Sequence, residues 1–324
     1  MRKMKVLLKS MGVLIILFIL INAYLVARFY LGQQEVVRHN EVLAGQSLEL
    51  PAVERLEITP VIELLPGMEG VKTEPGLSLL VKAEQDNILF DVGYNKDKAE
   101  TSPLLHNLEL LNVHLDDIDA IAISHNHPDH VGGMGFRNSE VMLSGKPLDL
   151  KNRNVFTPVS MSCATANTVT VDKPQLVGDA VASTGPQAVQ VFVTGKLLEQ
   201  ALLINVKDKG LVVVSGCGHP NIVRTVEMAR EITGLPVYAV VGGLHLYYTD
   251  IPAGVWGNIM GSSRLFSRSP NREEVVETVR RLKELGIQKA FISPHDSDQP
   301  TLQIFSDQFG DDYSPLKVGQ KVTI

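Results

Sequence analysis

The sequence predicts an α/β sandwich with helices on the outside, preceded by one transmembrane helix. Three observations support this prediction. A long apolar stretch follows several basic residues at the N-terminus. Short apolar runs, typical of buried strands, then alternate with segments that carry helix start and stop signals. Histidines follow four of these runs directly, at the places where strands are expected to end.

The N-terminal segment, residues 1–31, is predicted to be an uncleaved signal anchor. An apolar stretch from Met11 to Ala27 approaches the roughly 20 residues that span a bilayer, and small residues suited to signal-peptide cleavage are missing. Four basic residues precede the stretch: Arg2, Lys3, Lys5 and Lys9. They predict a cytoplasmic N-terminus and a single-pass protein of the cell membrane whose remaining chain is extracytoplasmic. A buried core helix is the alternative.

The rest of the chain is predicted to comprise a linker and one domain. Residues 32–50 are largely polar without a clear period, so we interpret them as the linker. The globular domain then covers residues 51–324.

Two helices are predicted from their caps. Asn221 is a candidate N-cap for a helix that reaches Thr233, and Gly234 follows its end. Asn271 is a candidate N-cap for a helix through Leu285, with Glu274 three residues on as a capping box.

Composition excludes some classes of function. With 324 residues, 44% hydrophobic content and a formal net charge of -6, the chain can bury one large core or two modest ones. The acidic balance argues against nucleic acid as a partner. Cys163 and Cys217 lack a motif spacing and predict no disulfide framework. Cys217 is interpreted as a small residue that fills a tight turn, with a metal-binding thiolate as the alternative.

The densest group of chemically active residues follows the apolar run at 120–123. It contains His125, His127, Asp129 and His130. Imidazole and carboxylate groups suit zinc, iron or manganese, and one such loop could serve two ions. Gly132 and Gly133 allow a tight turn beneath the site. A solvated polar loop is the alternative.

Three further histidines occur in the same setting. His219 follows the run at 211–214, His245 the run at 238–241, and His295 the run at 290–292. Because the ends of neighbouring strands in a sheet converge, we expect these side chains to meet the first group. The remaining histidines, His39, His106 and His114, lack this setting and are interpreted as surface or packing residues.

From about Gly76 to the C-terminus, the chain resembles the metallo-β-lactamase fold superfamily. Its motif H-x-H-x-D-H is present as His125, His127, Asp129 and His130. The segments 216–219 and 242–245 are most similar to the branch of dihydropterin-ribofuranosyl-aminobenzene phosphate synthase-like proteins. The resemblance implies a four-layer αββα sandwich.

The resemblance also implies a set of metal ligands. His125, His127 and His219 would hold a first ion, and Asp129, His130 and His295 a second. The default ion is zinc, with iron or manganese as alternatives. His245 falls where many members place a bridging aspartate. A neutral imidazole cannot bridge two cations, so the geometry or occupancy of the second site stays open. Asp91 would orient a ligand histidine through a hydrogen bond, with an ordinary turn aspartate as the alternative.

These ligands predict a membrane-anchored metallohydrolase. A metal-bound hydroxide would attack an ester, lactone, amide or phosphoester of a small-molecule substrate, with Asp129 as a catalytic proton acceptor. A non-catalytic metal-binding sensor or scaffold is the main alternative, and a true β-lactamase rests on fold analogy alone. The segments 134–190 and 247–270, the second with Trp256, are expected to cover the pocket. The substrate, the native metal and the oligomeric state do not follow from the sequence.

Overall fold

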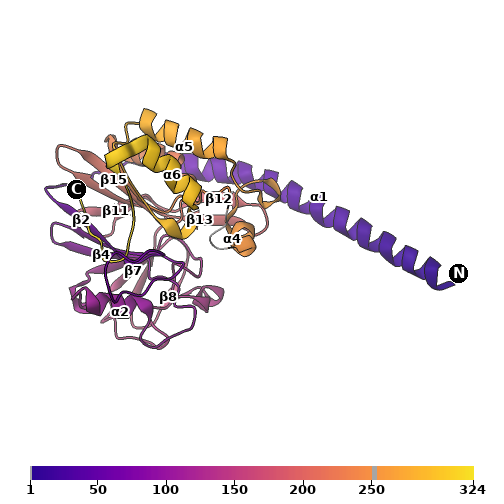
Figure 1. Cartoon of the computed structure of the whole chain (residues 1–324), viewed down its shortest axis with the longest axis horizontal. Coiled ribbons are helices and arrows are strands. Elements are labelled where there is room, and N and C mark those ends of the chain that lie inside the picture. The colour runs from indigo at the N-terminus through magenta and orange to yellow at the C-terminus, as the bar shows by residue number, and fades with distance from the viewer. Residues whose placement is uncertain (1, 250–253) are drawn as a thin grey trace.

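The computed structural model describes residues 2–249 and 254–324. Two large β-sheets face each other, and helices cover their outer faces (Figure 1). The six α-helices of these described ranges are α1 Arg2–Ala44, α2 Pro103–Leu110, α3 Ile222–Thr233, α4 Gly254–Gly261, α5 Arg272–Glu284 and α6 Gln299–Phe309. Short 3-10 helices are η1 Leu115–Asp117, η2 Met134–Asn138, η3 Leu265–Ser267, η4 Pro294–Asp296 and η5 Gly310–Asp312.

The first sheet lies against α3, α5 and α6. Its path is β10 Gln175–Leu176, β11 Val181–Ser183, β14 Leu202–Val206, β15 Gly210–Ser215, β16 Val237–Gly242, β17 Lys289–Ile292 and β18 Tyr313–Pro315, with β1 Ala52–Val53 beside β14. The second sheet lies against α2. Its path is β19 Val322–Thr323, β2 Leu56–Ile62, β3 Ser78–Ala83, β4 Asp86–Phe90, β5 Ala120–Ala122, β7 Asn154–Thr157 and β9 Asn167–Thr170. Two strand pairs stand apart: β6 Glu140–Val141 with β8 Ser162–Cys163, and β12 Gln187–Val191 with β13 Gly195–Glu199.

The alternating directions of the strand side chains create the four layers. In β15, Val212 and Val214 join the core between the sheets, whereas Leu211 and Val213 join the core beneath the helices. Strands buried on both faces read as continuous apolar runs, because successive side chains point to opposite faces. The predicted four-layer αββα sandwich is therefore confirmed, and so are both capped helices: Asn221 accepts from Val223 N, and Asn271 forms a capping box with Glu274.

Helix α1 differs from the prediction for residues 32–50. The helix continues to Ala44, so most of the predicted linker is helical. Phe29, Val36 and Leu43 are buried against the domain at intervals of seven residues. One apolar residue every second turn gives a narrow buried stripe, which is too sparse to register as helical periodicity. The division into residues 1–31, 32–50 and 51–324 otherwise stays a prediction.

The N-terminal part of α1 extends away from the domain (Figure 1). Among the described residues, α1 is the one helix long and apolar enough to cross a membrane, and its most apolar window is not buried in the protein.

Candidate metal centre

Parallel strand pairing gathers the predicted ligands at one edge of the two sheets. β15, β16 and β17 are parallel neighbours, and His219, His245 and His295 follow their ends. In the second sheet, β4 and β5 are parallel, which sets Asp91 beside the loop that carries His125. Side chains far apart in sequence meet because all these strands end at the same edge.

The histidine rings form one continuous cluster. The ring centroid of His125 lies 4.2 Å from that of His130 and 4.9 Å from that of His219. His127 Nδ1 lies 3.2 Å from His219 Nε2, and the His130 and His295 ring centroids are 5.3 Å apart. The predicted convergence of the four loops is therefore present in the structure.

Two groups of side chains within this cluster are compact enough to hold a cation. In the first, ligand atoms of His125, Cys217 and His219 lie within 4.8 Å of one another. The second group meets the same limit and consists of Asp129, His130, Cys217 and His295. His127 and His245 lie beside these groups but outside both sets. Their predicted roles as ligands stay predictions.

Cys217 is the member common to both groups. Its Sγ atom lies 3.0 Å from His130 Nε2 and 3.5 Å from His295 Nε2. The side chain is buried, and in the absence of a cation burial raises the pKa of the thiol well above its usual range, with nearby carboxylates adding to the rise. Membership of both groups favours the metal-binding alternative over the interpretation of Cys217 as a filler, because a bound cation would deprotonate the thiol despite its burial. Cys163 and Cys217 are both free, as expected from their spacing.

His245 occupies a different place from the one implied by the resemblance. Its ring centroid lies 4.3 Å from that of His219, and its Nε2 is 2.9 Å from the Tyr247 hydroxyl. It is thus next to the first group and not between the two. The residue placed between them is Cys217.

Asp91 lies where it can orient two ligand histidines. Its Oδ2 is 2.7 Å from His130 Nδ1 and accepts a hydrogen bond of 2.7 Å from Ser124 Oγ. Ser124 Oγ is in turn 2.9 Å from His125 Nδ1. A carboxylate that fixes the second ring nitrogen leaves the first aimed at a cation.

Sequence reasoning missed three buried carboxylates that hold the ligand loops. Glu199 accepts hydrogen bonds of 2.7 and 2.9 Å from the backbone N–H groups of Gly218 and His219. Asp296 accepts from the backbone N–H of His245 at 3.0 Å. Glu63 accepts from the Ser293 hydroxyl, which also contacts His295 Nδ1. Burial raises the pKa of Glu199 to about 7, and those of Asp296 and Glu63 to about 8.

Burial also keeps most of the histidines neutral. It lowers the pKa of His127 to about 4 and that of His245 to about 3, and it holds the pKa values of His125, His219 and His295 well below their usual range. Among the described residues, the buried atoms His125 Nε2 and His219 Nδ1 have no hydrogen-bond partner. Such neutral rings with free nitrogens are suited to bind a cation, so these residues fit a metal site.

His130 is the exception among the buried histidines. Burial lowers its pKa, but the charges of Asp91 and Asp129 raise it further, to about 9. In the absence of a cation the His130 imidazole is therefore protonated near neutral pH. A cation that binds at its Nε2 would have to displace that proton.

Helix α4 covers the cluster, as expected for the segment 247–270, of which residues 250–253 lie outside the described residues. A Cβ atom on Gly261 would lie 2.7 Å from His219 Cε1 and 2.6 Å from His245 Cε1. The backbone of α4 therefore lies directly on the ligands. A cavity of only about 30 Å³ lies beside the cluster, lined by His219, His245 and Arg264 among others. The Asp129 side chain, 24% exposed, marks where the site reaches the surface.

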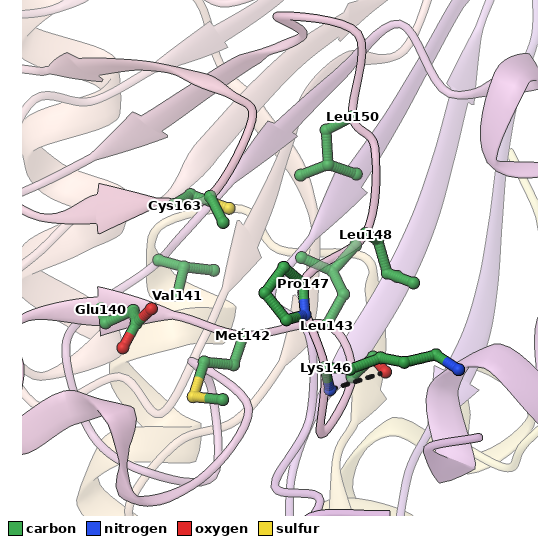
Figure 2. Close-up of a pocket in the computed structure, with 11 residues that line it drawn as sticks. Glu140, Val141, Met142, Leu143, Lys146, Pro147, Leu148, Leu150 and Cys163 are labelled. Carbon is green, nitrogen blue, oxygen red and sulfur yellow. Dashed lines mark hydrogen bonds between the residues drawn. The ribbon is translucent and has the colours of Figure 1, made fainter. Parts of the chain in front are cut away.

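The segment 134–190 does not cover this site in the same way. It contains the 3-10 helix η2, the short strands from β6 to β11 and most of β12, joined by turns and loops. Figure 2 shows the small cavity that it lines, with Glu140, Leu150 and Cys163 on its wall. The cavity holds about 40 Å³, which is too small for an organic substrate. The histidines of the candidate metal centre do not line this cavity.

The fold and the cluster are similar to those of metallo-β-lactamase-like proteins. Residues 71–136 match the family model described as the metallo-beta-lactamase superfamily. The resemblance seen in the sequence is therefore confirmed, and the chain has the fold of this superfamily.

Particular relatives make the resemblance more specific. The chain is 29% identical to a curated protein of Methanocaldococcus jannaschii named 7,8-dihydropterin-6-methyl-4-(beta-D-ribofuranosyl)-aminobenzene-5'-phosphate synthase, over 76% of this chain and 89% of that one. The solved structure of Tm1679, a metal-dependent hydrolase of the β-lactamase superfamily, is similar with a TM-score of 0.58 and 20% identity, over 82% and 98% of the two chains. The solved structure of the metallo-beta-lactamase fold protein YhfI from Bacillus subtilis is similar with a TM-score of 0.52 and 13% identity, over 84% of this chain and 100% of that one.

Proposed function

We propose that this chain is a membrane-anchored, metal-dependent hydrolase of a small molecule that contains an ester, lactone, amide or phosphoester bond. The observation that carries the proposal is the compact cluster of buried imidazole, carboxylate and thiol groups, several of which have free nitrogens. Donors of this kind suit zinc, with iron or manganese as alternatives. We propose two divalent cations, one for each group.

The cations would be held by residues of both groups. His125, His127 and His219 would hold the first, and Asp129, His130 and His295 the second, with Cys217 able to reach either. Bound divalent cations of this kind supply hydroxide near neutral pH by lowering the pKa of water from about 15.7 to about 7. Asp129, which is partly exposed, is the proposed proton acceptor. Helix α4 would exclude bulk water from the reacting bond.

The names of the relatives leave the substrate open. The Methanocaldococcus jannaschii protein is named as the synthase of a phosphorylated compound, which favours a phosphorylated substrate here. An extracytoplasmic domain would seldom meet a cytosolic pterin intermediate, so we do not carry that substrate over. A sensor or scaffold that binds metal without turnover is the second candidate, and the tightly covered site with its small cavity favours it.

The proposed location follows from helix α1. An unburied apolar helix after basic residues fits a single-pass anchor with a cytoplasmic N-terminus and an extracytoplasmic domain. Resistance to alkaline extraction, together with protease digestion of the domain in intact cells, would support it. A domain that is digested only after lysis would contradict the topology.

The test of the proposed activity compares wild type with His127→Ala and, as a matched control, His114→Ala. His114 is exposed and lies outside the cluster. Full-length protein in detergent is required, because α1 packs against the domain. We expect His127→Ala to lose metal and turnover together in a broad hydrolase screen, and His114→Ala to keep both. Bound metal without turnover on any substrate class would favour the sensor.

A further inference from the structure

The anchor helix and the domain are joined rigidly, without a flexible linker. Arg28 donates from Nη2 to the carbonyl oxygens of Phe192, at 2.9 Å, and Val193. Asn40 both donates to the carbonyl and accepts from the N–H of Ala188. These bonds fix the hairpin of β12 and β13 along α1. The tip of the hairpin therefore lies at the level of Arg28, directly after the apolar stretch that ends at Ala27.

The cover of the metal centre is attached to the same hairpin tip. Phe192 donates its backbone N–H to the Ser262 carbonyl at 3.2 Å, and Thr194 Oγ1 donates to the Met260 carbonyl at 3.4 Å. The aromatic rings also form a chain of contacts. The ring centroids of Phe29, in the anchor, and Phe192 are 5.6 Å apart, and those of Phe192 and Phe266 are 5.2 Å apart. Figure 1 shows α4 on the side of the domain that faces the free part of α1.

Phe266 is held outward in an uncommon backbone conformation. Its φ is +57°, in the left-handed region, and its side chain is 60% exposed. Hydrogen bonds from Asn258 Nδ2 to the Ser267 carbonyl and from Ser262 Oγ to the Arg268 carbonyl hold this turn. A non-glycine residue in this region is strained, so the surrounding structure must maintain the conformation. This strained turn keeps the aromatic ring of Phe266 exposed to the surroundings.

Other exposed aromatic residues lie at the same end of the anchor's apolar stretch. Tyr24 is 64% exposed and Tyr30 is 56% exposed. Tyrosine is enriched where a membrane-spanning helix passes through the headgroup region. Phe266 is linked through Phe192 to Phe29, which is adjacent to Tyr30 in the chain. The bilayer surface is therefore expected at the level of Phe266.

The other end of the cover touches the metal centre. Gly261, the last residue of α4, lies against His219 and His245 so closely that a Cβ atom would clash. The segment 254–268 thus extends from the ligand histidines to the expected membrane surface.

We propose that the segment 254–268 lies in the headgroup region of the membrane and that the centre acts on an amphipathic substrate. The apolar tail of this substrate stays in the bilayer, and its hydrolysable bond reaches the metal centre when the segment 254–268 moves aside, because the cavity there holds only about 30 Å³. The inference rests on the proposed hydrolase function and on the anchor. It narrows the substrate class to a lipid-like ester or phosphoester.

The position of the segment is tested by fluorescence quenching in full-length protein. Trp256 is the single tryptophan of the chain, so Trp256→Phe removes the native fluorescence. In this background, Phe266→Trp is the test variant and Leu110→Trp is the control. Leu110 is exposed and belongs to α2, which lies far from α1 in Figure 1. In phosphatidylcholine vesicles, lipids brominated near the headgroup should quench the fluorescence at position 266 and leave that at position 110 unchanged. Equal quenching, or none at position 266, would overturn the membrane location. A contact between two copies of the chain would give no quenching.

The substrate class is tested with pairs of nitrophenyl esters and phosphoesters that carry a short or a long alkyl chain, in the same vesicles. We expect a higher kcat/KM for the long-chain member, and Phe266→Ser should lower the long-to-short ratio roughly tenfold, as for the loss of about half of a phenylalanine's burial. Leu110→Ser should leave the ratio as it is. Equal rates for both members would overturn the lipid-like substrate. Hydrolysis of neither member would count against the hydrolase itself, while the quenching result would still stand.

Discussion

Cys217 Sγ lies 3.0 Å from His130 Nε2, inside a cluster of histidines that follow four different strands. The sulfur belongs to both groups of side chains that can hold a cation. A thiolate can contact two cations at once, whereas the neutral imidazole of His245 cannot. If two cations are bound, Cys217 would be the residue able to contact both, whereas His245 lies outside both groups.

The first prediction concerns this thiolate. Cobalt-substituted wild type should show a thiolate-to-metal charge-transfer absorption, because cobalt would bond to sulfur. Cys217→Ser should lose that band and weaken metal binding, whereas Cys163→Ser should keep it. A band that survives in Cys217→Ser would rule out the sulfur as a ligand.

The second prediction concerns Asp91. Asp91→Asn removes the charge beside His130 Nδ1 and the acceptor of the Ser124 hydroxyl. Loss of such a supporting carboxylate typically weakens metal binding by about 10–100-fold. Competition with a chelator measures the change. An affinity equal to that of wild type would show that Asp91 is only a turn residue.

The third prediction concerns the cover of the site. In Gly261→Val the new side chain would meet His219 and His245, so α4 must move outward. Cys217, which is buried, should then react faster with iodoacetamide in metal-free protein, as read by mass spectrometry. Gly45→Ala is the control, because a Cβ atom there meets nothing closer than 3.4 Å. Unchanged labelling of Gly261→Val would mean that α4 does not cover the centre.

The fourth prediction is a pH dependence at Glu274, which ties the cover to α5. Burial raises the pKa of Glu274, but hydrogen bonds from Arg268 and the Asn271 N–H lower it further, from 4.5 to about 2. A depressed carboxyl pKa stabilises the fold above the unfolded value of 4.5, and this contribution is lost as the pH falls toward about 2.

Glu274→Gln should therefore be less stable than wild type at pH 7, by up to about 1 kcal/mol because solvent screens this partly exposed pair. The difference should shrink as the pH is lowered from 4.5 to 2. Denaturant unfolding of the metal-free full chain measures it. A difference that stays constant over this range would contradict an ionic origin.

The fifth prediction tests the rigid attachment of the anchor. Asn40→Ala removes two hydrogen bonds to Ala188 and leaves that backbone N–H and carbonyl without their partner. An unsatisfied buried polar group costs about 1–3 kcal/mol. Hydrogen exchange of residues 187–199 should accelerate in the variant. Exchange as slow as in wild type would show that the hairpin does not depend on α1.

The sequence predicted those elements whose formation depends on residues close together in the chain. Strands such as β15 are buried on both faces and appear as apolar runs, and the caps of α3 and α5 lie at the predicted asparagines. The histidines converge because each follows a strand of the same sheet edge. Local patterns therefore predicted an α/β sandwich and the imidazole cluster, whereas the four layers were implied by the family resemblance.

The sequence was less informative where a role depends on distant partners. Cys217 looked like a filler because its neighbours His130 and His295 are remote in the chain. Glu199 and Glu63 are single acidic residues without a motif, and only the fold shows that they hold ligand loops. Residues 32–44 looked like a linker because their few buried side chains pack against a hairpin about 150 residues further along the chain.

The metal content of the full-length protein tests the central claim most directly. Elemental analysis of protein purified in detergent without added metal should find about two divalent cations per chain in wild type, and fewer in Cys217→Ser and His127→Ala. The His114→Ala control should match wild type. Wild-type protein that holds no divalent metal, even after incubation with zinc, iron or manganese, would contradict the account.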